Sequence, residues 1–301
     1  DGAVIRFDKL SMNFVTPYDS VFLMNTSGAL KITSHTFVGE GGRFDWTMAG
    51  LPSSEVYAEL GGYSFDIRKP EVNAEGAKLT YAGKLKEPVE GLFEYKSVRH
   101  DSIDDSTYPR FMSYYSNIKV DGFGPDLTYV GGFALKGAAM LSTSLLGDLS
   151  TIYVATNEMP RFRATSGIFE FKDSLMTTKR AKVVVYQGVD SIYHPAVRMK
   201  YDIPNRKLVL QKDNGGYRNT PYSASFFNMD FTADIIRWDL ESDSLDVSIL
   251  EARRMVPAYF ESIDHYKVED YRALGDQVYD FNPLSLVVAY SNKSGEQEFL
   301  V

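Results

Sequence analysis

Cysteine is absent from the 301-residue chain, so neither a disulfide bond nor a thiolate metal site can form. Long apolar runs are also missing, and no stretch predicts a membrane-spanning helix. Basic residues gather only in pairs such as Lys179-Arg180 and Arg253-Arg254, and the formal net charge is −8. Nucleic acid is therefore not an expected partner, because its recognition needs a basic patch.

The sequence also lacks the common catalytic motifs. It contains no GxSxG, no HExxH, no phosphate-binding P-loop and no dinucleotide fingerprint. Its histidines, His35, His100, His194 and His265, are never two or four residues apart, as a paired metal ligand would be. His194 precedes Pro195 in a predicted turn, where we expect it to be exposed. The motifs therefore assign no catalytic residue, and a non-catalytic role is favoured without excluding an enzyme.

Aromatic content and alternation predict an all-β fold. The chain contains 20 Tyr and 19 Phe, residues that favour half-buried strands. Over 180–213, three consecutive strands are joined by tight turns, and Val197 and Met199 alternate there with Arg198 and Lys200. Strands joined this closely pair antiparallel. We therefore expect antiparallel meander repeats forming a sandwich, a jelly roll or an open β-groove, with a short helical C-terminal segment.

A polar stretch and a recurring pattern divide the chain. The most polar segment, 99–109, marks an internal boundary. The predicted units are a first β unit over 1–105, a second over 106–265, and a helical segment over 266–301 that begins a further module. An Ala-Lys-strand-Tyr pattern starts at Ala77 and again at Ala181, which indicates an internal repeat, although unrelated meanders can look alike. Both ends look like cuts in a longer chain.

Four local patterns predict particular elements. Small residues over 138–149 favour a helix. Within 227–240 the apolar face changes by one residue, which is typical of a β-bulge inside one long strand. Asn282, a good N-cap, and the proline after it predict a C-terminal helix over 283–295. A shorter helix is expected over 266–274.

One cluster of acidic residues is a candidate metal site. Asp101, Asp104 and Asp105 carry carboxylate oxygens, the ligands that a hard cation such as Ca²⁺ prefers. They lie beside His100, without the spacing of an EF-hand or a nonapeptide repeat. The alternative is a solvated polar loop. Ca²⁺ is thus the one cofactor to which the sequence points.

Aromatic side chains provide a candidate ligand surface. Trp46, Tyr63, Tyr114, Tyr115 and Trp238 offer flat rings on which a sugar or a lipid can stack. Trp46 and Trp238 alternate with charged residues, so the alternative is that both belong to the core. A carboxylate pair for glycoside hydrolysis is defined by its separation in space, so none can be chosen among 40 Asp and Glu residues.

The segment 180–213 resembles one known family. Its strands and hairpins are similar to those of the periplasmic lipopolysaccharide-transport (OstA-like) β-jelly-roll family, in which hairpins stack into an open, twisted groove that carries an acyl chain. The matching positions are Ala181, Val183, Val184, Tyr186, Val197, Tyr201, Leu208 and Leu210. The Tyr-rich, cysteine-free β composition also resembles that of large gram-negative envelope proteins. The resemblance implies lipid handling in a cell envelope.

Three functional hypotheses follow. The first is a non-catalytic structural or ligand-binding module of a larger envelope protein, located in the periplasm or at the outer membrane or cell surface. Its partners are further domains of the same chain, and its ligand is lipid or glycan. The second is a carbohydrate-active jelly-roll enzyme, a glycosidase or lyase, and the third is a surface adhesin domain. A long apolar trough favours the first, facing carboxylates with stacked aromatics the second, and a flat Tyr-rich face the third.

Overall fold

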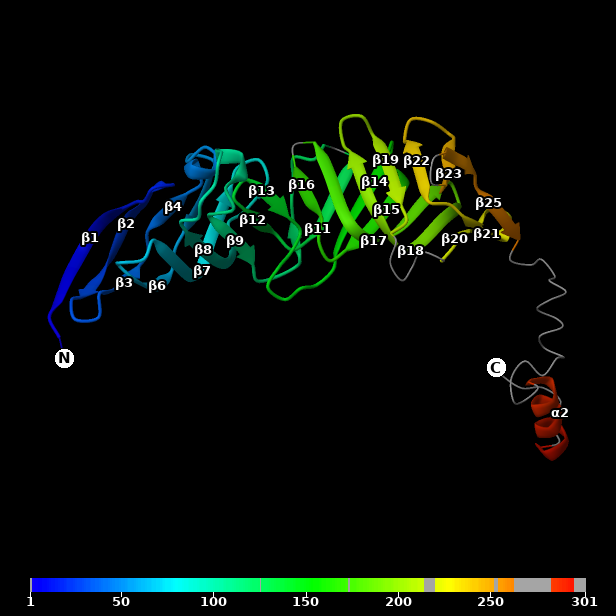
Figure 1. The fold of residues 1–301 in the computed structure, drawn as a ribbon, viewed down its shortest axis with the longest axis horizontal. Helices are drawn as coiled ribbons and strands as arrows, with labels where there is room; N and C mark the ends of the chain where they lie inside the picture. The colour runs from blue at the N-terminus through cyan, green and yellow to red at the C-terminus, as the bar shows by residue number, and fades with distance from the viewer. Residues whose placement is uncertain are drawn as a thin grey trace.

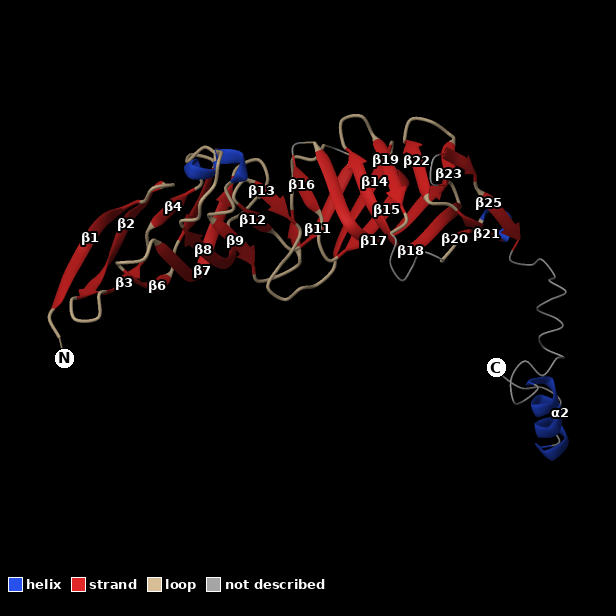
Figure 2. Ribbon diagram, viewed as in Figure 1, coloured by secondary structure: helices blue, strands red, loops and turns tan. Residues whose placement is uncertain are grey.

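The computed structural model describes residues 2–124, 126–172, 174–213, 220–251, 254–262 and 283–294. These residues are mostly strand, as Figure 2 shows, and the all-β prediction is confirmed. The strands form an elongated stack of two layers. It runs from β1 (Val4–Val15) at one end to β25 (Tyr259–Ser262) at the other (Figure 1).

Three long antiparallel hairpins connect the two layers. Their strands are β1 with β2 (Ser20–Lys31), β7 (Glu71–Tyr81) with β8 (Val89–Lys96), and β17 (Leu175–Gln187) with β18 (Asp190–Asp202). Each hairpin contains a register shift near its middle. The first half of β17 pairs with β16 (Glu170–Lys172), whereas its second half pairs with β15 (Met159–Ser166). Because a bulge bends a strand, each hairpin passes from one layer into the other.

The first layer is a continuous antiparallel ladder. Between the hairpins it contains β3 (Thr36–Glu40), β6 (Gly62–Asp66), β9 (Arg110–Ser113), β12 (Ala134–Lys136), β13 (Ala139–Leu141), β16, β19 (Lys207–Gln211), β22 (Ile235–Asp239), β23 (Leu245–Glu251) and β24 (Arg254–Pro257). One half of each hairpin strand completes it.

The second layer consists of two blocks, completed by the other halves of the hairpin strands. The first block contains β4 (Arg43–Asp45) and β5 (Val56–Glu59). The second contains β10 (Ile118–Lys119), β11 (Leu127–Gly131), β14 (Ser150–Thr156), β15, β20 (Tyr222–Ala224), β21 (Met229–Thr232) and β25. Short 3₁₀ helices lie in the connections: η1 (Thr47–Ala49), η2 (Ile103–Asp105) and η3 (Phe226–Asn228).

The core fills the space between the layers, because alternate residues of each strand point inward. Phe44 of β4 contacts Phe93 of β8, with ring centres 4.9 Å apart. Phe162 of β15 meets Tyr201 of β18 edge to face at 5.0 Å. Each contact joins a second-layer strand to the first-layer half of a hairpin. The buried side chains therefore form one sandwich interior along the stack.

The helix expected over 138–149 is wrong. The chain forms β13 there, which pairs with β12 on one side and β16 on the other. Leu146 and Leu149 are 65% and 66% exposed, so the segment has no apolar helical face to bury. Ser142 instead accepts a 2.7 Å hydrogen bond from the Phe169 N–H, which holds the segment against its neighbour.

The β-bulge expected within 227–240 is also wrong. The segment forms two strands, β21 in the second layer and β22 in the first. The chain changes layer at Ala233 and Asp234. Ala233 is fully buried, and the Asp234 N–H donates a 2.9 Å bond to the Ser248 oxygen of β23. The one-residue change of phase therefore marks a crossing, since the inner faces of the two layers point in opposite directions.

Expectations about the organisation of the chain have different outcomes. The C-terminal helix is confirmed as α2 (Pro283–Ser294). The helix expected over 266–274 lies outside the described residues. The boundary near residue 105 falls between β8 and β9, which pair with each other, and the division into 1–105, 106–265 and 266–301 stays a prediction. Both copies of the proposed repeat lie on long bent hairpins, β7–β8 and β17–β18.

Candidate ligand-binding cavity

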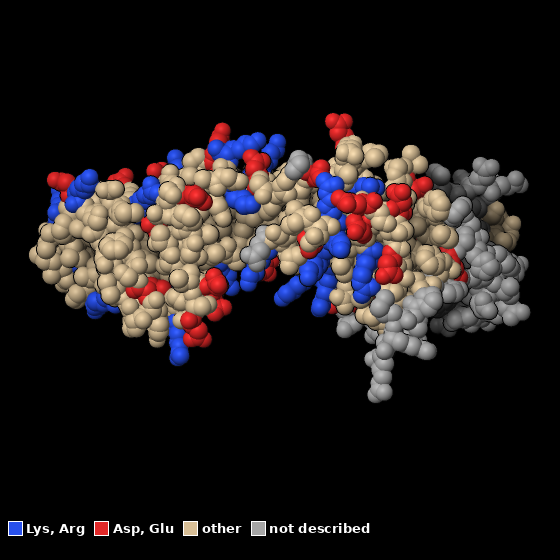
Figure 3. All heavy atoms as spheres, turned by 90° about the horizontal axis from the view of Figure 1, so that it is seen from above, with Lys and Arg blue, Asp and Glu red and all other residues tan. Residues whose placement is uncertain are grey.

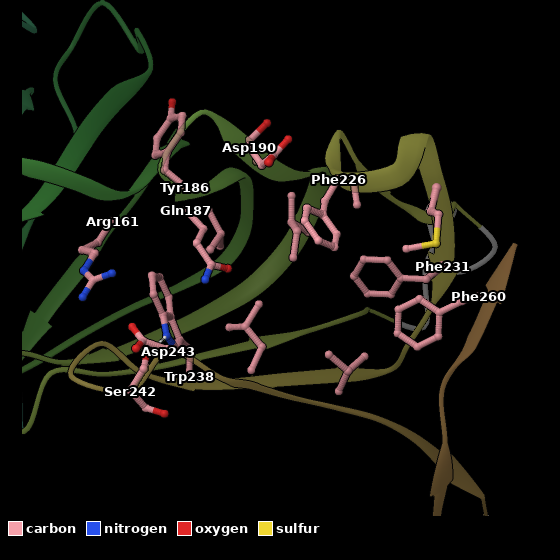
Figure 4. A pocket seen from close by; sticks show the side chains of 17 residues that line it. Arg161, Tyr186, Gln187, Asp190, Phe226, Phe231, Trp238, Ser242, Asp243 and Phe260 are labelled. Carbon is pink, nitrogen blue, oxygen red and sulfur yellow. Dashed lines mark hydrogen bonds between the residues drawn. The ribbon is translucent and has the colours of Figure 1, made fainter. Parts of the chain in front are cut away.

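A cavity of about 410 Å³ lies between the layers near β25 (Figure 4). Its walls are mainly apolar and come from both layers. They include Val185, Ile192, Phe231 and Phe260 of the second layer and Leu245 and Val247 of the first. The volume falls within the roughly 300–1,000 Å³ range of small-molecule sites. The interior of the sandwich is therefore hollow at this point and large enough for a ligand.

One end of the cavity carries a charge. Trp238 of β22 lies there and donates a 3.0 Å hydrogen bond from Nε1 to the Ser242 backbone oxygen. The guanidinium carbon of Arg161 lies 5.6 Å from the centre of the Trp238 ring, within the range of a cation–π contact. Figure 4 shows Asp243 beside Trp238. The cavity thus combines apolar walls with a small polar end.

A bulge accounts for the direction of Arg161. In the β14–β15 ladder, Val154 pairs with Phe162 but Ala155 pairs with Pro160, so Arg161 is an extra residue. Regular alternation would turn Arg161 away from the core that buries Phe162. The bulge changes the direction of the side chain, so that Arg161 lines the cavity. Pro160 is tolerated beside the bulge because the ladder requires no hydrogen bond from its nitrogen.

Hydrogen bonds fix another part of the rim. Ser225 Oγ donates to the Asp190 carboxylate at 2.9 Å, and the Ser191 N–H donates to Ser225 Oγ at 2.9 Å. These bonds tie the start of η3 to the first residues of β18. Phe226, the next residue, lines the cavity. The start of β18 therefore holds the backbone beside Phe226 in place.

A buried polar cluster lies next to the cavity. The Tyr222 ring stacks on Phe231 at 5.2 Å and lies 4.6 Å from the His194 ring. Lys212 Nζ is 5.5 Å from the centre of the Tyr222 ring and has no hydrogen-bond partner in the described part of the chain. Burial lowers the pKa of Lys212 and raises the pKa of Tyr222, because it disfavours the charged form of each group. Phe231 separates this cluster from the cavity.

The expectation that His194 is exposed is wrong, because only 1% of the residue is exposed. β18 continues through Pro195, so His194 lies within a strand that enters the core. Its Nδ1 accepts a 3.0 Å bond from the Ala196 N–H, and its Nε2 lies 3.2 Å from the Thr220 oxygen. Nε2 therefore carries the proton and donates it. Burial lowers the pKa of His194 to about 4, so the ring is neutral at pH 7.

The five aromatic residues considered as a ligand surface lie in different surroundings. Trp46 and Tyr63 are buried in the N-terminal part of the core. Tyr114 is half-buried, whereas its neighbour Tyr115 is 60% exposed. Trp238 is buried at the C-terminal end and is the one of the five that lines the cavity. A ligand in the cavity would therefore contact a single member of the set.

The acidic residues considered as calcium ligands are exposed. Asp101 precedes η2, and Asp104 and Asp105 lie within it. Ser102 Oγ donates a 2.7 Å bond to Asp105. Among the residues that the structure describes, no three His, Asp or Glu side chains are grouped so as to hold a metal ion. Calcium binding in this loop stays a prediction.

Sequence reasoning misses most of the cavity. Its lining residues lie on strands spread from β15 to β25, so no local spacing connects them. One signal for Arg161 was present. Pro160 interrupts a run of alternating residues, and proline inside a strand indicates a bulge or an edge.

No protein-family model matches the chain, and neither a curated protein nor a solved structure matches it. In the described part of the chain, no helix has the length and apolar character needed to cross a membrane. On the face drawn in Figure 3, basic side chains gather near the middle of the stack and acidic side chains lie beside them. Function is therefore inferred from the cavity.

Proposed function

We propose that this chain is a non-catalytic β module of a larger cell-envelope protein, and that it binds the apolar part of a lipid between its two layers. The observation that carries the proposal is the cavity of about 410 Å³ with apolar walls from both layers. Burial of apolar surface stabilises a complex by about 25 cal/mol per Å². A glycan needs hydrogen-bond partners over most of its surface, whereas most of the residues that line this cavity are apolar, so lipid is the favoured ligand.

The shape of the stack supports a structural role beside binding. The layers share three bent hairpins, so neither layer can slide past the other without breaking ladder bonds. β1 and β25 lie at opposite ends of the stack (Figure 1). An extended, internally braced body suits a spacer between neighbouring domains of one chain.

Binding of an uncharged apolar probe tests the proposal. We expect N-phenyl-1-naphthylamine to bind the protein and to increase its fluorescence as it leaves water. Leu245→Trp places a larger side chain in the cavity wall. This variant should weaken binding by about tenfold or more, because the indole occupies the space that the probe needs.

The matched control is Val189→Trp. Val189 lies in the turn between β17 and β18, is fully exposed and does not line the cavity. The Val189→Trp variant carries the same new side chain on the surface, so its affinity for the probe should equal that of the wild type. Absence of probe binding, or equal binding by Leu245→Trp and wild type, would contradict the proposal.

A second experiment tests the biological setting. Native mass spectrometry of the protein purified from its source cells should show a bound lipid that is lost in Leu245→Trp. The full-length protein should also fractionate with the cell envelope. Recovery from the cytosol with no bound lipid would count against both parts of the proposal.

A further inference from the structure

Arg161 distinguishes the cavity from a purely apolar hole. It is the one Lys or Arg among the described residues that line the cavity. Its guanidinium lies over Trp238 at the polar end, and the bulge in β15 turns it there. A charged group at one end of an apolar cavity gives a ligand both an orientation and a preference for one sign of charge.

The Arg161 guanidinium has no partner of opposite charge within the described residues. No ion pair or hydrogen bond joins it to another side chain or to the backbone there, and its Nε is buried without a partner. A buried donor without a partner is unfavourable unless something else supplies the acceptor. Carboxylates and phosphates fit a guanidinium well, because they accept two parallel N–H bonds.

We propose that the ligand is a single-chain amphiphile whose anionic headgroup, a carboxylate or a phosphate monoester, pairs with Arg161. The chain lies along the walls formed by residues such as Phe231, Leu245 and Val247. This assignment rests on the proposed function, since it specifies the ligand of the same cavity. Arg161 acts here as a binding residue and takes part in no reaction.

Two carboxylates also line the cavity, and they act against an anion. Asp190, at the start of β18, already accepts the bond from Ser225 Oγ. Asp243 is exposed and belongs to the same end as Trp238. An anionic headgroup at Arg161 therefore experiences repulsion from Asp243. Removal of that charge by Asp243→Asn should strengthen the binding of an anion and weaken the binding of a cation.

Four ligands with the same chain length test the inference: dodecanoate, dodecyl phosphate, dodecanol and dodecylamine. Titration calorimetry below the solubility limit of dodecanol, and below the micelle concentrations of the three ionic compounds, should show both anions binding at least about tenfold more tightly than dodecanol, because a charged hydrogen-bonded pair is added. The tighter of the two anions identifies the headgroup as carboxylate or phosphate. Dodecylamine should bind most weakly.

Arg161→Gln should remove the advantage of the anions and leave dodecanol binding unchanged, which also shows that the cavity is intact. Arg163→Gln is the matched control, since Arg163 lies on the same strand and does not line the cavity. Equal affinities for dodecanoate and dodecanol, or anion binding that Arg161→Gln does not change, would overturn the headgroup assignment and leave the proposed function standing. Tighter binding of dodecylamine would overturn it too. If none of the four compounds binds, the proposed function itself fails.

Discussion

The two tryptophans of the chain lie between the same layers in contrasting surroundings. Trp46 is fully buried in the N-terminal part of the stack, with its ring edge to face against Phe93 at 5.9 Å. Trp238 lies near the C-terminal end, beside Arg161 and the cavity. The rings around Trp46 pack directly against one another, whereas Trp238, Phe231 and Phe260 border the cavity together with aliphatic side chains and Arg161.

The two ends of the stack contribute differently to stability and to binding. Phe44 contacts both Phe93 and Tyr95, at 4.9 and 5.1 Å, so each ring near Trp46 is supported by others. Side chains that line a cavity lack such contacts on one side and lose the dispersion energy that they would provide. Hollow packing persists in folded proteins where function requires the space. The difference between the two ends therefore supports a binding role for the C-terminal end.

The largest expected effect comes from deleting one ring at each end. Phe93→Ala should lower the free energy of unfolding by about 3–5 kcal/mol, because a fully buried ring with several aromatic contacts is lost. Phe231→Ala removes an equally buried ring that borders existing empty space. Its loss should be smaller by about 1 kcal/mol or more. Urea unfolding measures both values, and equal losses would remove the contrast.

Acidification should destabilise the protein through the C-terminal half, where His194 is buried. The pKa of His194 is about 4 in the folded state and near 6.5 when unfolded, so the unfolded chain binds more protons between these values. Stability should therefore fall as the pH drops from about 6.5 to 4, by on the order of 2 kcal/mol. His194→Gln should flatten this part of the profile.

The control for this measurement is His35→Asn. His35 is exposed and has φ of 53°, a backbone conformation that asparagine also tolerates. This variant should keep the pH dependence of the wild type. A His194→Gln profile that coincides with the wild type would show that another group causes the acid sensitivity.

The smallest effect is expected for Arg161 in the ligand-free protein. Arg161→Met keeps a long apolar stem against Trp238 and removes a charge that has no partner in the described structure. The free energy of unfolding should be unchanged or rise by up to about 1 kcal/mol. Thermal unfolding provides the measurement. If the free energy of unfolding fell by more than about 1 kcal/mol, Arg161 would have a structural role, like that of the packed residues near Trp46.

Strands could be predicted from the sequence where only one face is buried. In β18 and β19, Val197, Met199, Leu208 and Leu210 are buried at every second position, as their alternation indicates. The C-terminal helix could also be predicted, because its N-terminal proline follows a good capping residue. The resemblance of this region to the lipopolysaccharide-transport family stays a hypothesis.

The failures share a physical cause. Three predictions failed because the structure depends on which layer the chain enters, and local composition does not encode that. They concern the segments 138–149 and 227–240 and the exposure of His194. The cavity is even harder to predict from local sequence, since its walls come from residues as far apart in the chain as Arg161 and Phe260. Trp238 could be predicted as a candidate because its ring is large. The contact of Arg161 with Trp238 could not, because the bulge in β15 sets the direction of the Arg161 side chain.

The most direct test is a crystal structure of the protein grown with dodecanoate. We predict a single extended chain of density between the layers, bordered by Phe231 and Val247, with the carboxylate at Arg161 and no ligand near Trp46. A structure in which protein side chains fill this space, or in which dodecanoate binds elsewhere, would contradict the assignment of the cavity as the functional site.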